Sequence, residues 1–259
     1  MYELASFLFP LLLFVALWEI FAHTGLVKPI LLPPPSKILK RLLIEAGKGA
    51  GEIGLADHLL NSLYRLVIGF STGAMVGALS GLGMGMNRWI YGYLNPVITV
   101  LMPVPGITWT PILVLVLGFG DPTLITVTFI ASFFPVAYNT AAGVRSVKRD
   151  HIWAGKIMGV DRMGTVFKIL IPSSAPYIIT GLKLGLARGW RTLIACEMIA
   201  AALTGIGFWI FDAKEYLKTD VIYGGIIVMA MVFVIIDRIG FGYLERQTIE
   251  KWGMSADIG

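Results

Sequence analysis

The chain has 259 residues, of which 56% are hydrophobic and only 14% are charged, and its formal net charge is +5. A soluble globular domain carries about 45–50% apolar and about 25% charged residues. The composition therefore excludes an ordinary cytosolic enzyme, a disordered protein and a secreted disulfide scaffold. The single cysteine, Cys196, cannot form an internal disulfide. The length suits one domain of several membrane helices, because each span takes about 20 residues.

Six apolar stretches predict an all-α, polytopic membrane protein that forms a single domain over residues 1–259. The expected spans lie at about 4–23, 66–86, 92–118, 122–144, 176–202 and 221–238. We expect the first span to remain in the mature protein, because Glu3 precedes it and no small-residue cleavage site follows. Before the second span, three prolines predict an extended segment, and Ser36 is the expected N-cap of a short interfacial helix.

Glycine recurs at every fourth position of the second expected span. The five residues are Gly69, Gly73, Gly77, Gly81 and Gly85. Because the α-helix has 3.6 residues per turn, they lie on one slowly drifting ridge. Such a ridge lets another helix backbone approach closely, so we expect it to serve packing. Gly181, Gly185 and Gly189 repeat the pattern in the fifth span, which predicts packing against the second span or against a second copy of the chain.

The third expected span is interrupted by proline. Residues 89–120 lack charge and contain Pro96, Pro103, Pro105 and Pro111. The stretch is longer than one span needs, so irregular backbone is expected at its ends. Non-helical backbone at membrane depth must be buried in protein or line a wet cavity.

The charge distribution favours a cytoplasmic N-terminus. In that orientation the cytoplasmic loops hold nine basic residues and the external segments hold seven. The bias rests mostly on residues 145–168, which carry six basic residues and two acids. We therefore expect both termini in the cytoplasm. No nucleic-acid motif accompanies the positive charge, so membrane lipid is the expected partner and nucleic acid is not.

Residues 145–172 are too polar to span a membrane and too long for a tight connection. An exposed short helix with small and apolar residues is suited to a groove of another protein. An amphipathic helix on the membrane surface fits the same pattern. The residues alone leave both interpretations open.

The spacing within this segment resembles the cytoplasmic loop of ATP-binding-cassette (ABC) importer permeases. That loop has the form E-A-A, three residues, Gly, nine residues, I-x-L-P, and here Trp153-Ala154-Gly155 precedes Gly159 and then 169–172 at the same spacing. Trp153 replaces the Glu, Gly155 the second Ala, and Ile171 the Leu. The motifs at residues 61–65, 102–111 and 181–198 also resemble the nitrate, sulfonate and taurine branch, so the likeness covers about 25–250.

The resemblance implies a type I ABC importer permease in a bacterial inner membrane. Two permease copies, expected as a homodimer, would pair with two cytosolic ATPases, and a periplasmic binding protein would deliver a small solute that is expected to be anionic. The chain has no G-x-x-x-x-G-K-[ST] phosphate loop, so it would be a transport subunit and not an enzyme. It would hold no cofactor, and the ATPases would bind ATP and magnesium. The residues implied in coupling to them are Trp153, Ala154, Gly155, Met158, Gly159 and Val160.

Ionisable residues inside the fifth span are the other functional candidates, because such groups usually face the bundle interior or water. Arg188 and Arg191 share a helix face, and they either line an anion path or pair with neighbouring helices. Glu197 lies about half a turn round the helix from Arg188, so the two should not pair. Asn139 in the fourth span is a further polar candidate for the path, although helix–helix hydrogen bonding also fits it.

Two other functional classes remain in competition on the residues alone. A secondary transporter or channel would need broken helices or inverted repeats, and the prolines of residues 89–120 supply only one half of such a pattern. An intramembrane enzyme would need a catalytic constellation, and none is visible. The three histidines lie on separate segments without metal-ligand spacing, so no metal site is expected.

Overall fold

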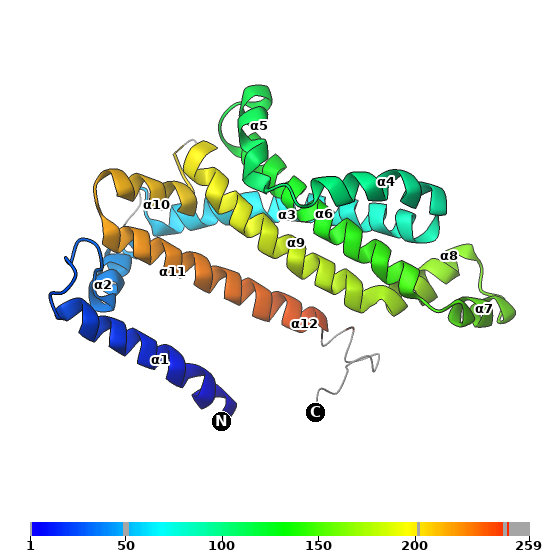
Figure 1. Ribbon diagram of the computed structural model, residues 1–259, viewed down its shortest axis with the longest axis horizontal. Coiled ribbons are helices and arrows are strands. Elements are labelled where there is room, and N and C mark those ends of the chain that lie inside the picture. The colour runs from blue at the N-terminus through cyan, green and yellow to red at the C-terminus, as the bar shows by residue number, and fades with distance from the viewer. Residues whose placement is uncertain (1, 49–51, 201–202, 246–247, 249–259) are drawn as a thin grey trace. The chain divides into compact units, whose positions relative to one another are not determined.

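The computed structural model describes residues 2–48, 52–200, 203–245 and 248. Within these ranges every regular element is helical, as the composition predicts. In chain order (Figure 1) they are α1 (Tyr2–His23), α2 (Pro35–Ala46), α3 (Leu55–Met86), α4 (Arg88–Leu101), the 3₁₀ helix η1 (Gly106–Trp109), α5 (Thr110–Leu117), α6 (Asp121–Ser146), α7 (Arg149–Ile157), α8 (Arg162–Gly164), the π-helical η2 (Thr165–Leu170), α9 (Ile171–Ala200), α10 (Ile206–Glu215), α11 (Thr219–Ile235), the π-helical η3 (Ile236–Phe241) and α12 (Gly242–Glu245).

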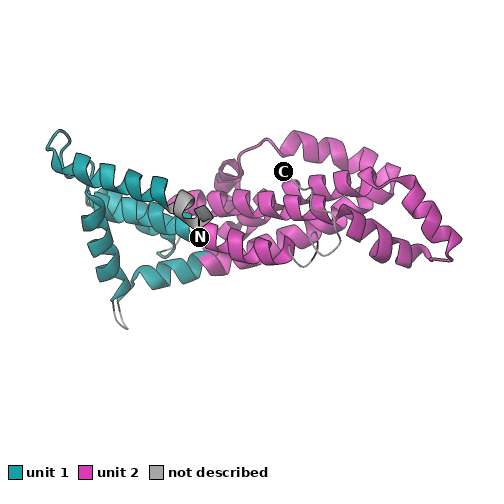
Figure 2. Ribbon diagram, turned by 90° about the horizontal axis from the view of Figure 1, so that it is seen from below, with its two compact units in different colours: residues 1–62, 203–231 teal, residues 63–202, 232–259 magenta. Residues whose placement is uncertain are grey.

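These elements form two compact units (Figure 2). Unit 1 takes the described residues of 1–62 and 203–231, and unit 2 takes those of 63–202 and 232–259. Unit 2 holds both glycine ridges, the proline-rich segment and the segment that resembles the ABC permease loop. It therefore contains every residue that the sequence singles out for function.

Four helical stretches of the described chain are long and apolar enough to cross a membrane. They are Leu55–Met86, Asp121–Ser146, Arg162–Ala200 and Thr219–Glu245. The pair Arg88–Leu101 and Gly106–Leu117 adds a fifth if the two helices are counted as one bent span, and Phe9–His23 is a shorter apolar helix. Six spans therefore stay a prediction, and residues 201–202 at the end of the predicted fifth span lie outside the described chain.

The irregular backbone of the third expected span lies inside residues 92–118 and not at their ends. Helix α4 stops at Leu101, and the chain turns by 96° before η1 and α5 continue. Pro103 and Pro105 occupy this bend. Neither residue has a backbone N–H to donate, and the ring of each clashes with the carbonyl four residues earlier. Two prolines so close together therefore stop the helix at mid-span.

The segment 145–172 is mostly helical, and its second half merges with the following span. A helix-like path runs from Arg162 through η2 into α9, so the fifth span begins well before the expected residue 176. Pro172 sits at the start of α9 directly after the π-helical turn. Insertion of a π turn is one of the few ways in which a helix accommodates interrupted backbone bonding.

Helix α6 lies between the two glycine ridges. On α3, an ideal Cβ built at Gly81 would lie 2.6 Å from Ala137 O, and one at Gly73 would lie 2.7 Å from Phe129 O. On α9, a Cβ at Gly185 would lie 3.0 Å from Ser132 O. The expectation of a packing ridge is confirmed, and the main partner of the α9 ridge is α6, with Phe70 of the second span also 3.7 Å from the ideal Cβ position of Gly185. Packing of this ridge against a second copy of the chain stays a prediction.

Three helices of unit 2 are also joined by a buried arginine. Arg65 of α3, which is 2% exposed, donates from Nη1 to Glu197 Oε1 of α9 at 2.8 Å. Its Nε donates to Asp121 Oδ1, at the first residue of α6, over 2.7 Å. Glu197 is fully buried. A buried carboxylate is tolerated when an opposite charge and hydrogen bonds compensate for its lost hydration, and Arg65 supplies both.

In unit 1, the expected short amphipathic helix is present as α2, but Ser36 does not cap it. Pro34 occupies the N-cap position, and Ser36 lies inside the first turn. Ser36 donates from N to Glu19 Oε2 at 3.0 Å and from Oγ to Oε1 at 2.7 Å. The carboxylate of α1 therefore takes the place of a cap, at the end of α2 where the helix dipole favours negative charge.

We predict that Gly81→Ala destabilises the protein, because its Cβ would force the backbones of α3 and α6 apart. The expected loss is about 1–3 kcal/mol, as for other overpacked interiors. Thermal unfolding of the purified protein in detergent measures it. Gly83→Ala on the same helix is the matched control, since its Cβ meets only the Ile90 side chain at 3.7 Å. Equal midpoints for the two variants would contradict the packing role of the ridge.

We predict a larger effect for Arg65→Met, which leaves Glu197 buried without its arginine. Breaking one side of a buried pair costs about 3–5 kcal/mol. Replacing both partners, as in Arg65→Met with Glu197→Met, should recover part of that loss, because no buried charge is then left over. The same unfolding measurement tests both variants. A double variant no more stable than Arg65→Met would argue against a charge-based cause.

Candidate functional site

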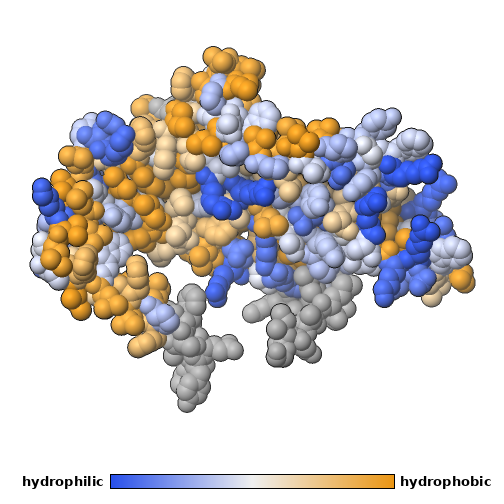
Figure 3. Space-filling view, in the orientation of Figure 1, coloured by the Kyte–Doolittle hydropathy of each residue, from blue (hydrophilic) through white to orange (hydrophobic). Residues whose placement is uncertain are grey.

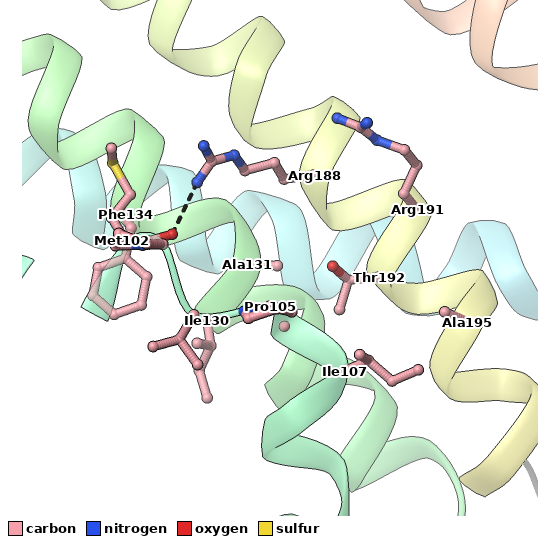
Figure 4. Close-up of a pocket in the computed structure, with 13 residues that line it drawn as sticks. Met102, Pro105, Ile107, Ile130, Ala131, Phe134, Arg188, Arg191, Thr192 and Ala195 are labelled. Atoms are coloured by element: carbon pink, nitrogen blue, oxygen red, sulfur yellow. Dashed lines mark hydrogen bonds between the residues drawn. The ribbon is translucent and has the colours of Figure 1, made fainter. Parts of the chain in front are cut away.

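A cavity of about 510 Å³ opens in unit 2 beside the bend between α4 and η1 (Figure 4). Three walls enclose it. They are formed by residues 102–107 at the bend, by Ile130, Ala131 and Phe134 of α6, and by Arg188, Arg191, Thr192 and Ala195 of α9. Close packing against α6 fixes the position of α9, so the two arginines are held at one wall. The irregular backbone at the bend thus lines a cavity, which is one of the two arrangements that non-helical backbone can adopt inside a membrane.

Arg188 and Arg191 give the cavity its charge. Arg188 donates from Nη1 to Met102 O at 3.2 Å (Figure 4). Arg191 donates from Nε to Ala187 O at 3.0 Å. A guanidinium has five N–H donors, so these bonds fix each side chain without exhausting its donors. Among the described residues that line the cavity there is no carboxylate. The arrangement favours an anion, because guanidinium groups bind oxygen anions through charge-assisted, often bidentate hydrogen bonds.

The other two residues expected on a path lie elsewhere. Asn139 donates from Nδ2 to Pro135 O at 2.8 Å, and its Cβ lies 2.9 Å from the ideal Cβ position of Gly181. It therefore faces the α6–α9 interface. Glu197 belongs to the ion pair with Arg65. Of the four candidate path residues, the structure therefore places Arg188 and Arg191 at the cavity, and it places Asn139 and Glu197 elsewhere.

Two features of the site were not singled out from the sequence. Thr192 lines the cavity beside Arg191, and it was not distinguished within the motif at residues 181–198. Arg65 was noted only within a motif, although a signal for its role existed. Glu197 is an acid inside a span and requires a cation from another helix, and Arg65 directly precedes the charge-free stretch of α3.

Helix α7 presents apolar side chains to solvent at the end of unit 2, where hydrophilic residues gather over α7 and α8 (Figure 3). Trp153, Ile157 and Met158 are 66%, 85% and 80% exposed. Ala154 is exposed beside them. Large exposed apolar side chains within a polar surface mark interaction sites. These four residues are referred to below as the α7 surface.

Gly155 and Val160, unlike the α7 surface, are turned toward the rest of unit 2. Gly155 is buried, and an ideal Cβ there would lie 2.3 Å from Ile169 Cδ1 of η2. Val160 is half-buried. Gly155 therefore lets α7 rest directly on the helix that continues into α9.

Gly159 ends α7 in the left-handed conformation, with φ at +77°. Its N–H bonds to Lys156 O at 3.0 Å, and the N–H of Val160 bonds to Gly155 O at 3.0 Å. These two bonds satisfy the last carbonyls of the helix in the manner of a glycine C-cap. Side-chain space is not the constraint, because an ideal Cβ would meet nothing within 4 Å. The glycine at this spacing is therefore explained by its backbone conformation.

Comparison with known proteins identifies the chain's relatives. Residues 65–246 match the family model described as "Binding-protein-dependent transport system inner membrane component". The chain is 36% identical over 234 residues to the taurine transport system permease protein TauC of Escherichia coli (strain K12), covering 90% of this chain and 84% of that protein. It is 33% identical to the bicarbonate transport system permease protein CmpB of Synechocystis sp., covering 92% and 86%. It is 32% identical to the nitrate import permease protein NrtB of Synechocystis sp., covering 84% and 80%.

A solved structure has the same fold. A chain of the MetNI methionine ABC transporter, in an inward-facing conformation, superposes with a TM-score of 0.58 at 17% sequence identity, covering 71% of this chain and 92% of that one. The family model spans most of the chain, and the relatives align over nearly all of it. The chain therefore belongs to the binding-protein-dependent transport system inner membrane components and is a multi-pass permease subunit of an ABC importer.

Proposed function

We propose that this chain forms the path of a small anionic solute through the membrane and that Arg188 and Arg191 line that path. The observation that carries the proposal is the cavity of about 510 Å³ with two arginines and no carboxylate among its described lining residues. A cavity of one sign of charge raises the local concentration of the opposite ion.

The relatives support an anionic solute. They are described as permeases for taurine, bicarbonate and nitrate, and each of these solutes carries an anionic oxygen group. Arginine suits such groups because its planar fork donates two parallel hydrogen bonds. Thr192 adds a hydroxyl at the same wall.

The α7 surface is the proposed contact with the ATPase. The segment 145–168 carries six basic residues, which favours its placement in the cytoplasm with the N-terminus. In the proposed assembly, two copies of this chain bind two ATPases that hold ATP and magnesium, and a periplasmic protein delivers the solute. The chain itself uses no cofactor and leaves ATP hydrolysis to those partners. The C-terminus is proposed to be cytoplasmic too, although residues 249–259 lie outside the described chain.

We predict that Arg188→Gln and Arg191→Gln each lower solute uptake about tenfold or more, because each removes a charged hydrogen-bond donor from the cavity. Uptake of labelled taurine, nitrate and bicarbonate is measured in proteoliposomes that contain the permease, its ATPase and its binding protein. Lys183→Gln is the matched control. It removes a cation from the same helix, but Lys183 pairs with Glu245 at 2.6 Å and does not line the cavity. Normal uptake in both arginine variants would refute the proposed path.

We predict that Gly159→Glu lowers the amount of solute moved per ATP hydrolysed, whereas Gly159→Asn retains most of it. Left-handed backbone costs an ordinary residue about 1–2 kcal/mol, but asparagine tolerates it better. Glutamate would therefore strain the end of α7 beside the α7 surface. Parallel measurements of ATP hydrolysis and uptake give the ratio. Full, substrate-stimulated transport by Gly159→Glu would remove any role of this position in coupling.

A further inference from the structure

Unit 1 contains a second polar cavity, which the proposed solute path does not use. Its volume is about 190 Å³, well above the ~30 Å³ that one water occupies in the liquid. Helices α2, α3, α10 and α11 all contribute to its walls. The ionisable residues that line it are Arg41, Glu45, Lys48, His58, Asp212 and Lys218.

The buried carboxylate of this cavity, that of Glu45, is already paired with two cations that line the same cavity. Glu45 is only 4% exposed, and both of its oxygens are engaged. Lys48 Nζ lies 2.6 Å from Oε2, and Arg41 Nη2 lies 3.4 Å from Oε1. The second carboxylate, Asp212, is exposed. Three cations therefore face two carboxylates, and one positive charge is left in excess.

Hydrogen-bond donors are also in excess. The Nε of Arg41 is buried, and within the described chain it has no hydrogen-bond partner. His58, which is 5% exposed, accepts at Nδ1 from the N–H of Gly205 at 3.2 Å. A neutral imidazole that accepts at one nitrogen donates from the other, so Nε2 carries the proton. A buried donor without a partner, as at Arg41 Nε, is costly, and His58 lines the same cavity.

The ring of His58 is held in place by aromatic contacts. It stacks on Trp209, with ring centroids 6.1 Å apart, and on Phe208 at 6.4 Å. The bond from Gly205 fixes the ring's rotation as well. The donor at Nε2 therefore belongs to a fixed group, which is what a binding site requires.

We propose that the unit 1 cavity binds a small inorganic anion through Arg41, Lys48 and His58. Water could fill the space, but it would not supply the negative charge that a lining of three cations and two carboxylates favours. A single anion supplies negative charge and can accept from the unpaired Nε of Arg41. The site is separate from the Arg188 and Arg191 cavity, which belongs to unit 2.

Iodide is a suitable probe, because it is a small anion that quenches tryptophan fluorescence and Trp209 lines the cavity. The permease–ATPase complex is titrated with iodide at constant ionic strength in lipid nanodiscs. The component that disappears in Trp209→Phe reports the cavity. We expect that component to be quenched saturably and nitrate to compete with iodide. Quenching that rises without saturation, as for random collisions, would overturn the proposal.

Two variants of opposite sign separate an anion site from a purely structural ion pair. Arg41→Gln should raise the half-saturating iodide concentration about tenfold, because a charged donor is lost. Asp212→Asn should lower it, because a competing negative charge is removed. Glu215→Gln is the matched control, since it removes an exposed acid of the same helix that does not line the cavity.

The Asp212→Asn comparison remains decisive if Arg41→Gln fails to fold, because Asp212 is exposed and makes no ion pair among the described residues. Equal half-saturation in wild type, Asp212→Asn and Glu215→Gln would overturn the proposal. Arg191→Gln should leave the Trp209 signal unchanged. Loss of that signal in Arg191→Gln would place the anion in unit 2 and would likewise overturn it.

Discussion

The close approach of α6 to two glycine-lined helices is the constraint on which unit 2 depends. In a bilayer, lipid tails are as apolar as leucine, so helices associate through dispersion contacts and interhelical hydrogen bonds and not through the hydrophobic effect. Dispersion falls steeply with distance, which makes the missing Cβ atoms of α3 and α9 valuable. With α6 held on both sides, the arginines of α9 and the bend after α4 face each other across a defined space.

Charge inside unit 2 is handled in two different ways. Around Arg65, cation and carboxylates are brought together, and the result is a neutralised link between α3, α6 and α9. Around Arg188 and Arg191, the described lining offers backbone carbonyls but no acid. The first arrangement stabilises a fold, whereas the second leaves a positive potential, on which the proposed solute path depends. Arg65 lies at the start of an apolar stretch and Arg188 and Arg191 lie inside one, and their partners decide which role each can have.

Much of this organisation could be predicted from the sequence, for physical reasons. The four-residue glycine period is a local property of one helix. It therefore predicts that the helix face with Gly81 makes a close contact, but it does not identify the helix that makes that contact. The identity of that partner depends on the tertiary arrangement, and for this reason α6 was missed. The spacing from Trp153 to Pro172 identified the loop because it is fixed along the chain, and the conformation of Gly159 explains one of its fixed positions.

Other features could not be predicted because they depend on distant contacts. Glu197 and Arg65 are 132 residues apart in the chain, and no local pattern connects them. Irregular backbone was expected at the ends of residues 89–120 and not at Pro103 within them, since prolines alone do not reveal how far the preceding helix extends. The start of the fifth span was placed too late, at about residue 176, because the segment before it is polar, whereas the π turn before Pro172 lets the helical path continue from Arg162.

That continuity has a mechanical consequence. The 39 residues of Arg162–Ala200 form one rod, of roughly 58 Å at 1.5 Å per residue. Ile169, on which Gly155 of α7 rests, and Arg188 therefore lie on the same lever, separated by roughly 28 Å along its axis. A tilt of a few degrees at the end that carries α7 displaces the guanidinium groups by an ångström or more. A displacement imposed on α7 by a partner ATPase would thus reach Arg188 and Arg191 through one continuous helix.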